Sequence, residues 1–220
     1  MTRSDALAEA DALSQAPDLW RDHEGRPTFR HRPKLIGPEI SFTIEERDLA
    51  WSDGRSTGRL PLHQIESVRI VFRPANLYTR RYRVEVRQRL GKKNWFSNVS
   101  WRGMVEIEAH DAPFTAFVRA LCARIGQTSP NARFIAGEPA WRYMIIAATT
   151  AGLTISLAYL AFQAISAVNW GLMGLVAFIG GYTVWQMSLW LTKNRPATFD
   201  PLDPPAILLP DVKPPRASAP

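Results

Sequence analysis

The longest uncharged stretch of the chain limits its fold more than any other feature. Residues 143–192 contain no Asp, Glu, Lys, Arg or His. Roughly 20 apolar residues in helical form cross a bilayer core, so these 50 residues (192 − 143 + 1) can hold two crossings and a tight turn. The alternative is a helical hairpin buried in a soluble protein, but without charges neither helix has a polar face to turn toward water. The stretch therefore predicts a membrane hairpin.

The middle and the flanks of this stretch predict its topology. The turn is expected at Asn169-Trp170-Gly171, because Asn and Gly permit the backbone angles of a reversal. The helices are then residues 144–168 and 172–191 of a hairpin over 141–192. Aromatic and basic residues anchor membrane helices at the interface, and those that flank this hairpin are Trp141, Arg142, Tyr143, Trp170, Trp190 and Lys193. Both ends are basic and the turn is uncharged, so the positive-inside rule predicts two crossings with both termini in the cytoplasm.

Small residues recur every four positions within both predicted helices. They are Ala148, Gly152 and Ser156 in the first helix, and Ala177 and Gly181 in the second. This spacing suits close helix contact, and we expect it to pack the two helices together rather than to form a dimer. The absence of charges within the stretch disfavours a transporter or a pump.

The residues before the hairpin carry most of the charge. Residues 1–142 contain 23 Lys and Arg and 17 Asp and Glu, a net of +6 out of the total of +7. Prolines and interspersed charges in residues 1–37 predict a flexible arm. From Pro38 onward, short segments alternate apolar and polar residues, as in Ile40, Phe42 and Ile44, with turn signals such as Ser52-Asp53-Gly54 between them. We expect an antiparallel meander of about six or seven strands with one face toward solvent.

A helix is predicted at the end of this domain, over residues 111–126. Asp111 is the expected N-cap, and Gly126 with Pro130 is the expected stop. An apolar stripe runs along one face, through Phe114, Phe117, Val118, Leu121, Cys122 and Ile125. Cys122 lies in this stripe and is therefore expected in the core rather than as a nucleophile. Residues 38–140 thus predict an α+β fold, a small barrel or sandwich that the helix covers.

The order of strands and helix resembles a known family. About seven short strands, a C-terminal amphipathic helix, the segment Leu60-Pro-Leu-His-Gln-Ile-Glu-Ser-Val68 and the attached hairpin are similar to bacterial PH-like domain membrane proteins. The likeness covers roughly residues 38–128 and the hairpin. The stretch Ser100-Trp-Arg-Gly-Met104 also resembles uncharacterised alphaproteobacterial proteins of this layout. The resemblance implies a PH-like β domain at a bacterial inner membrane. It implies no activity and no functional residue.

A run of cations is the strongest candidate for a binding site. Residues 69–102 hold ten Lys and Arg but a single acid, Glu85. The predicted binding residues are Arg69, Arg73, Arg80, Arg81, Arg83, Arg87, Arg89, Lys92 and Lys93. Period-two spacing places the arginines opposite the apolar residues of their strands, so paired strands would share one basic surface. Its expected partner is anionic membrane lipid, at about 1 kcal/mol per cation; a solvated face without a ligand is the alternative. Nucleic acid is disfavoured, because no reading element is recognisable.

Catalytic and cofactor motifs are missing from the sequence. His23, His31, His63 and His110 are scattered, no His or Cys pair has metal-ligand spacing, and no Gly-rich loop resembles a phosphate cradle. We therefore predict no enzyme, no cofactor and no metal. The predicted function is a membrane-anchored binding or assembly module that engages anionic lipid, a protein partner or another copy of the chain. The alternatives are a membrane-tethered enzyme of unrecognised type and a nucleic-acid-binding membrane protein.

The last segment, residues 193–220, is dense in proline. That density favours an extended cytoplasmic tail. Residues 206–210 are its single apolar cluster, and we expect a disordered tail rather than one that docks.

Overall fold

The computed structural model describes residues 19–73, 80–89, 91, 93–103, 106–167 and 170–210. Residues 1–18 of the predicted arm, Lys92, Asn169 of the predicted turn and residues 211–220 of the tail lie outside this part. The chain has an α+β fold and divides into two compact units. One unit is residues 1–136 together with 197–220, and the other is residues 137–196.

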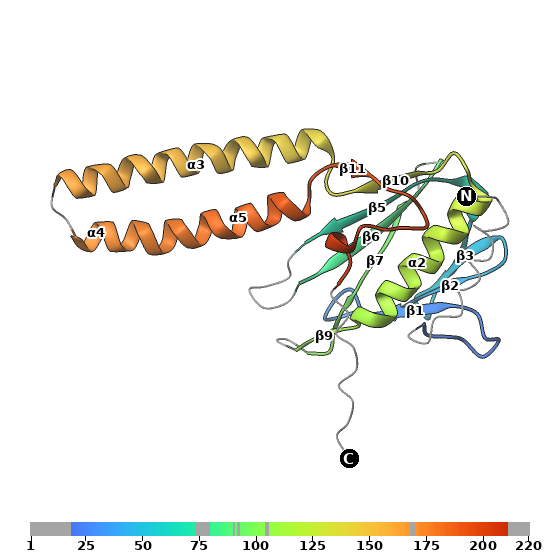
Figure 1. Cartoon of the computed structure of the whole chain (residues 1–220). Coiled ribbons are helices and arrows are strands. Elements are labelled where there is room, and N and C mark those ends of the chain that lie inside the picture. The colour runs from blue at the N-terminus through green and yellow to red at the C-terminus, as the bar shows by residue number, and fades with distance from the viewer. Residues whose placement is uncertain are drawn as a thin grey trace, which may run out of the picture. The chain divides into compact units, whose positions relative to one another are not determined.

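Two main sheets build the first unit (Figure 1). The four-stranded sheet has the order β1-β2-β3-β4, with β1 at Thr28–His31, β2 at Ile40–Ile44, β3 at Asp48–Ser52 and β4 at Thr57–Pro61. The five-stranded sheet has the order β11-β10-β5-β6-β7, with β11 at Ala197–Thr198, β10 at Arg133–Ala136, β5 at Ile65–Phe72, β6 at Tyr82–Gln88 and β7 at Lys93–Ser97. A short ribbon joins β8 (Val99–Trp101) to β9 (Ile107–Ala109), and the 3-10 turn η1 (Leu62–Gln64) leads from β4 into β5.

The predicted meander is confirmed for the consecutive strands from β2 to β4 and from β5 to β7, which pair antiparallel. The turn predicted at Ser52-Asp53-Gly54 also forms. Gly54 adopts a φ of 78°, and Asp53 Oδ1 accepts hydrogen bonds from the backbone N–H groups of Arg55 and Ser56. A purely antiparallel sheet is wrong, since β10 returns after a helix and pairs with β5 in parallel. A helical crossover allows this direction, whereas a tight turn does not.

The helix α2 spans Asp111–Thr128, and its predicted apolar stripe is buried throughout. Two details differ from the prediction. His110 occupies the N-cap position and Asp111 is the first helical residue. Gly126 lies inside the helix, where a Cβ would come within 2.8 Å of the Pro201 ring. Its small size therefore serves packing rather than helix termination.

Phenylalanine rings connect both sheets and α2 in one core. Phe42 and Phe96 stand 5.2 Å apart between ring centroids, and Phe96 lies 5.5 Å from Phe117. Phe29 of β1 contacts Phe96, Phe114 and Phe117 at 5.7 to 5.8 Å. Aromatic pairs at these distances add to the stabilisation from burying their area. The core therefore needs a ring from β1.

The prediction of a flexible arm over residues 1–37 is wrong for its described second half. β1 pairs with β2 over four residues, and the Phe29 ring is fully buried. Leu19 is also buried, and Trp20 stacks on Phe29 at 5.7 Å. Prolines on either side of the strand suggested a loop, but the tertiary contacts of one phenylalanine outweigh that local preference.

The prediction of a disordered tail is wrong for residues 197–210. β11 pairs with β10, and the Phe199 ring lies 5.7 Å from that of Phe134. The 3-10 turn η3 (Ala206–Leu208) contacts β5, and Leu208 and Leu209 are buried. Proline prevents a long helix but permits an extended chain that places two leucines against the sheet. Residues 197–210 therefore belong to the folded unit.

The second unit consists of helical segments that lie side by side (Figure 1). They are α3 at Ala140–Ser166, α4 at Trp170–Leu175, the π-helical η2 at Val176–Gly180 and α5 at Gly181–Lys193. Within the described residues, α3 alone is long and apolar enough to cross a membrane, by length and composition. The predicted second crossing is divided by η2 into stretches that are each shorter than a bilayer core requires. Trp170 and Gly171, which we expected in the turn, begin α4.

The helix α3 packs against the segments that follow it through residues spaced seven apart. Thr150 and Ala164 are the buried residues of α3, and Leu157 lies midway between them. A Cβ added to Gly180 would meet Leu157 Cδ1 at 3.1 Å, so this glycine allows close approach. The small-residue faces that we predicted for this contact are exposed instead, at Ala148, Gly152, Ser156, Ala177 and Gly181. Small residues occur on several faces of these helices, so their spacing alone does not select the contact.

The start of α3 and the end of α5 are joined by their backbones. Glu138 N–H donates to Asn194 C=O at 3.2 Å, and Asn194 is fully buried. Gly137 adopts a φ of 75°, and the carbonyl oxygens of Asn194 and Arg195 occupy the space that a Cβ would need. In the first unit, Ala136 pairs with Ala197. The chain thus leaves and re-enters the sheet at adjacent positions.

Candidate functional site

The predicted basic surface is built on the outer face of the five-stranded sheet. Strand register places Arg69 of β5 opposite Glu85 of β6, and Glu85 opposite Trp95 of β7. The neighbouring pairs on this face are Ser67 with Arg87 and Val71 with Arg83. Residues of the other parity, such as Val84 and Val86, are fully buried in the core. The outer face is therefore the face opposite the core, as the period-two pattern predicted.

The structure brings most of the predicted binding residues together and separates a few. Arg69, Arg83, Arg87 and Lys93 lie on the strands of the outer face. Arg73 follows β5, Arg80 and Arg81 precede β6, and Arg89 follows β6. Lys92 lies outside the described residues. The set is thus one continuous surface along β6 with additional arginines at both of its ends.

Glu85 neutralises the centre of the outer face. Its side chain is only 9% exposed and accepts ion pairs from Lys93 Nζ at 2.6 Å and from Arg83 Nε at 3.2 Å. The Arg83 guanidinium also lies 4.0 Å from the centre of the Trp95 ring, in a cation–π contact. Arg83 and Lys93 are therefore engaged within the protein. In the sequence, Glu85 stands out as the single acid among ten cations. Which of these cations it pairs with depends on the register between β6 and β7.

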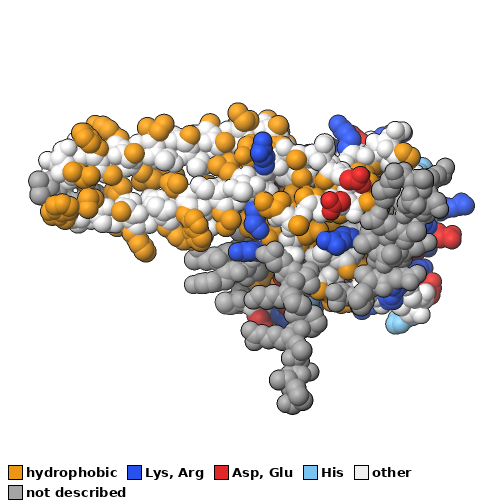
Figure 2. Space-filling view, viewed as in Figure 1, with side chains coloured by type: hydrophobic (Ala, Val, Ile, Leu, Met, Phe, Trp, Pro, Cys, Tyr) orange, Lys and Arg blue, Asp and Glu red, His pale blue; other side chains and the backbone are white. Residues whose placement is uncertain are grey.

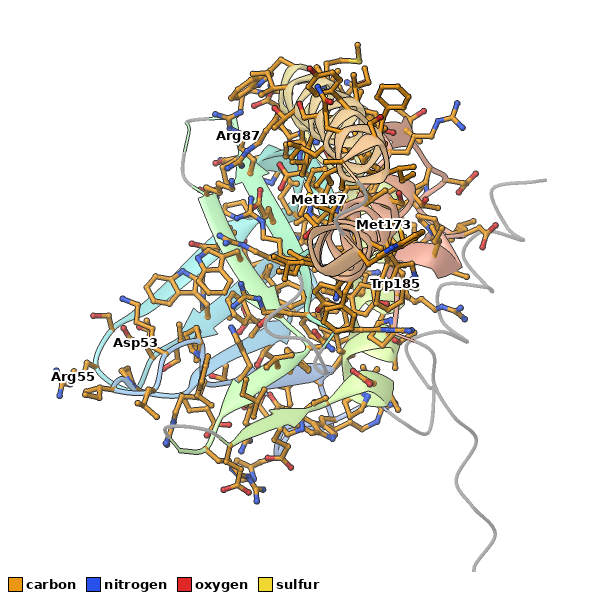
Figure 3. All side chains as sticks on the ribbon, turned by 90° about the vertical axis from the view of Figure 1, so that its left-hand side faces the viewer. Asp53, Arg55, Arg87, Met173, Trp185 and Met187 are labelled. Atoms are coloured by element: carbon orange, nitrogen blue, oxygen red, sulfur yellow. The ribbon has the colours of Figure 1, made fainter. Side chains whose placement is uncertain are left out.

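Arg87 and Arg89 remain as exposed cations on this side of the sheet. Both side chains are exposed, and in the described part of the chain neither forms an ion pair. Figure 3 shows Arg87 projecting from β6, at a distance from Asp53 and Arg55 in the turn of the smaller sheet. Positive charge at the outer face is consequently strongest at its edges, away from Glu85.

The predicted interface anchors lie at the ends of the helical segments. Trp141 and Arg142 are exposed in the first turn of α3, and Arg142 Nη1 pairs with Glu138 at 3.4 Å. Tyr143 is half-buried in the same turn. Trp170 is exposed at the start of α4, while Trp190 and Lys193 are half-buried near the end of α5. Exposed apolar side chains cover much of the visible surface between these ends (Figure 2).

A cavity of about 500 Å³ opens on the smaller sheet. Its lining mixes polar and apolar surface and consists of Ser41, Thr43, Glu45, Ala50, Trp51, Ser52, Thr57, Gly58 and Arg59. Glu45 pairs with Arg59 at 3.6 Å and with Arg26 at 3.5 Å. The lining combines hydroxyl groups with the Glu45 carboxylate, which both arginines already engage in ion pairs.

The remaining reactive side chains are enclosed. Cys122 is buried as predicted, and burial raises the pKa of its thiol to about 12. His31 is also fully buried, and its pKa falls to about 4, first through burial and second through the charge of His110. Among the described residues, no group of three or more His, Cys, Asp or Glu side chains could hold a metal ion. A buried neutral thiol is a poor nucleophile.

Comparison with known proteins does not assign the chain to a family. No protein-family model and no curated protein matches it.

Proposed function

We propose that the chain is a membrane-anchored, non-catalytic binding module of bacterial inner-membrane type, whose PH-like β unit engages anionic lipid through the outer face of its larger sheet. The observation that carries the proposal is the combination of α3, which has the length and composition of a membrane span, with a sheet face rich in arginine. Tethering beside a charged leaflet raises the effective lipid concentration, so weak individual contacts suffice.

Features of the second unit support a two-crossing anchor. The backbone stays in the right-handed helical region at Leu175, Gly180 and Gly181, so Trp170 to Lys193 can act as one helical run of 24 residues (193 − 170 + 1). The adjacent ends of α3 and α5 carry Arg142 and Lys193. Under the positive-inside rule, this arrangement favours both termini in the cytoplasm.

The charge pattern favours a weak attraction of the sheet face to the anionic membrane surface, rather than tight binding of one lipid by all nine predicted cations. Glu85 already pairs with two of the nine predicted cations. The exposed Arg87 and Arg89 then contribute roughly 2 kcal/mol, at about 1 kcal/mol each. Such attraction is screened by salt. A scaffold role toward a protein partner or a second copy would use the same exposed surface without this lipid dependence.

The test uses the first unit alone, with the helical second unit (residues 137–196) removed. Because Ala136 pairs with Ala197, a short Gly-Ser turn can replace residues 137–196 and leave β10 and β11 paired. After circular dichroism has checked the fold, cosedimentation with vesicles of phosphatidylglycerol and phosphatidylcholine measures binding. We expect binding at low salt, release as ionic strength rises, and a loss of up to about 30-fold in Arg87→Gln/Arg89→Gln.

The matched control is Arg55→Gln, which removes a positive charge from the turn of the smaller sheet and should change binding less than twofold. Equal binding to neutral and anionic vesicles would contradict the lipid proposal. A protein partner for the outer face would then be the leading alternative, and co-purification from native membranes would identify it.

A further inference from the structure

The loop between β1 and β2 presents two neighbouring aliphatic side chains to water. Leu35 is 38% exposed and Ile36 is 89% exposed. Among the described residues of the first unit, the only other exposed large apolar side chain is Ile207 of η3, at 49%. A single apolar residue on a protein surface needs no explanation. Two adjacent ones at a loop tip gain free energy wherever an apolar medium takes the place of water.

The base of this loop is fixed to the folded unit, whereas its tip stands clear of it. Arg32 N–H donates to Ser100 Oγ at 3.1 Å, and Arg32 C=O accepts from Trp101 N–H at 3.1 Å. At the tip, a Cβ added to Gly37 would meet one atom within 4 Å among the described residues, Lys34 Cβ at 3.8 Å. The two aliphatic side chains are therefore held out from the first unit.

Exposed cations flank the two aliphatic residues. Arg30, Arg32 and Lys34 all have exposed side chains, and in the described part of the chain none of the three forms an ion pair. Glu39 is the one acid between residues 28 and 44. An apolar tip beside cations matches a bilayer, in which the acyl chains lie beneath a layer of anionic headgroups.

The connections to the second unit bring such a bilayer within reach. Residues 137–139 separate β10 from α3, and residues 194–196 separate α5 from β11. Three extended residues span roughly 10 Å, and α3 has the length and composition of a membrane span. These short connections favour the membrane over a soluble protein as the partner of the loop.

We propose that Leu35 and Ile36 insert into the boundary between the headgroups and the acyl chains of the membrane, while the flanking cations contact anionic headgroups. This inference rests on the proposed function, since it requires α3 to cross the membrane. It adds an apolar contact to the electrostatic attraction of the outer face. Salt screens the attraction between charges but not the burial of aliphatic side chains.

The experiment uses the full chain in lipid nanodiscs of phosphatidylglycerol and phosphatidylcholine, with an NBD fluorophore on Gly37→Cys. This variant keeps both aliphatic residues, and the chain's single natural cysteine, Cys122, is fully buried and does not compete for the label. Lipids with a doxyl group at the top of the acyl chain quench a label that lies at that depth. We expect quenching at least about fivefold stronger at position 37 than in Arg55→Cys, a label in the exposed turn of the smaller sheet. The difference should persist at high salt.

The variant Leu35→Ser/Ile36→Ser, made in Gly37→Cys, should reduce the quenching to the level of Arg55→Cys. Ile207→Ser removes an exposed apolar side chain elsewhere and is the matched control, which should leave the quenching unchanged. A melting curve of each variant checks its fold.

Two results would overturn insertion and leave the anchor intact: equal quenching at positions 37 and 55 in the loaded nanodisc, or quenching that survives Leu35→Ser/Ile36→Ser. A label that is shielded from water but not quenched by doxyl lipid would also overturn it and would assign the loop to a second copy of the chain. A chain that does not enter nanodiscs would refute the proposed anchor, and the insertion with it.

Discussion

The histidine in β1 is the most unusual single residue of the core. His31 is completely buried, and its ring centroid lies 6.0 Å from those of Phe29 and Phe42 and 5.9 Å from that of Trp95. Within the described residues, neither ring nitrogen has a hydrogen-bond partner. A buried polar group without a partner opposes folding, and a charged one opposes it far more. The ring is therefore neutral in the folded protein.

Acid is expected to destabilise the first unit through His31. Its folded pKa of about 4 lies below the unfolded value of 6.5, so its stabilising share is complete above pH 6.5 and is lost as the pH falls toward 4. At about 1.4 kcal/mol per pKa unit, the loss reaches about 3 kcal/mol. Urea denaturation between pH 4.5 and 7.5 measures it. His31→Phe should remove this part of the pH dependence, while His63→Gln, an exposed control, should retain it. The same pH slope in both variants would refute the assignment.

Among the elements, α2 is the one whose apolar sequence pattern corresponds most directly to buried residues. Every residue of its apolar stripe is buried, whereas Arg119 on the opposite face is exposed. The Phe117 ring reaches both sheets, at 5.8 Å from Phe29 and 5.5 Å from Phe96. Loss of this ring would leave a cavity between three elements that cannot all move to fill it.

Phe117→Ala is expected to lower the free energy of unfolding by about 3 to 5 kcal/mol, and Leu121→Ala by about 2 to 5 kcal/mol. Arg119→Ala should change it by less than about 0.5 kcal/mol, since surface substitutions usually do. Chemical denaturation of the unit that lacks residues 137–196 measures all three. Similar small losses in all three variants would mean that α2 does not pack on the sheets.

At the scale of the whole molecule, the helical segments interrupt a folded unit. The first unit contains residues from both sides of residues 137–196, and β11 and η3 complete its larger sheet and core. A fragment of residues 38–140 would therefore lack the Phe29 ring and the buried Leu208 and Leu209. The residues before and after the apolar segment have to fold together, so they must lie in the same compartment. The proposed topology, with both termini in the cytoplasm, meets this requirement.

Topology is tested with reporters in the intact chain. An alkaline phosphatase placed after Ala167 is expected to be active outside the cytoplasm, because α3 would carry it across the membrane. Reporters at Met1 and Pro220 should behave as cytoplasmic. A phosphatase that is active at either terminus would contradict the cytoplasmic placement of the termini, and an inactive one after Ala167 would contradict a crossing by α3.

The sequence by itself determined those features that follow from local periodicity. An uncharged stretch of 50 residues required long apolar helices, the alternation at Ile40, Phe42 and Ile44 required a strand, and the spacing in α2 required an amphipathic helix. The arginines of β5 and β6 were assigned to one face for the same reason, because side chains alternate along a strand. Each of these inferences needs only neighbours in sequence.

Tertiary structure decided what depends on partners distant in sequence. Phe29 makes a strand of a proline-flanked segment because rings from β7 and α2 contact it. Residues 197–210 are folded because they pack on β10 and β5. Register alone decided that Glu85 meets Lys93 and that Arg73 faces Arg81. A shift of one residue would have reversed both outcomes, because it moves every side chain of a strand to the opposite face.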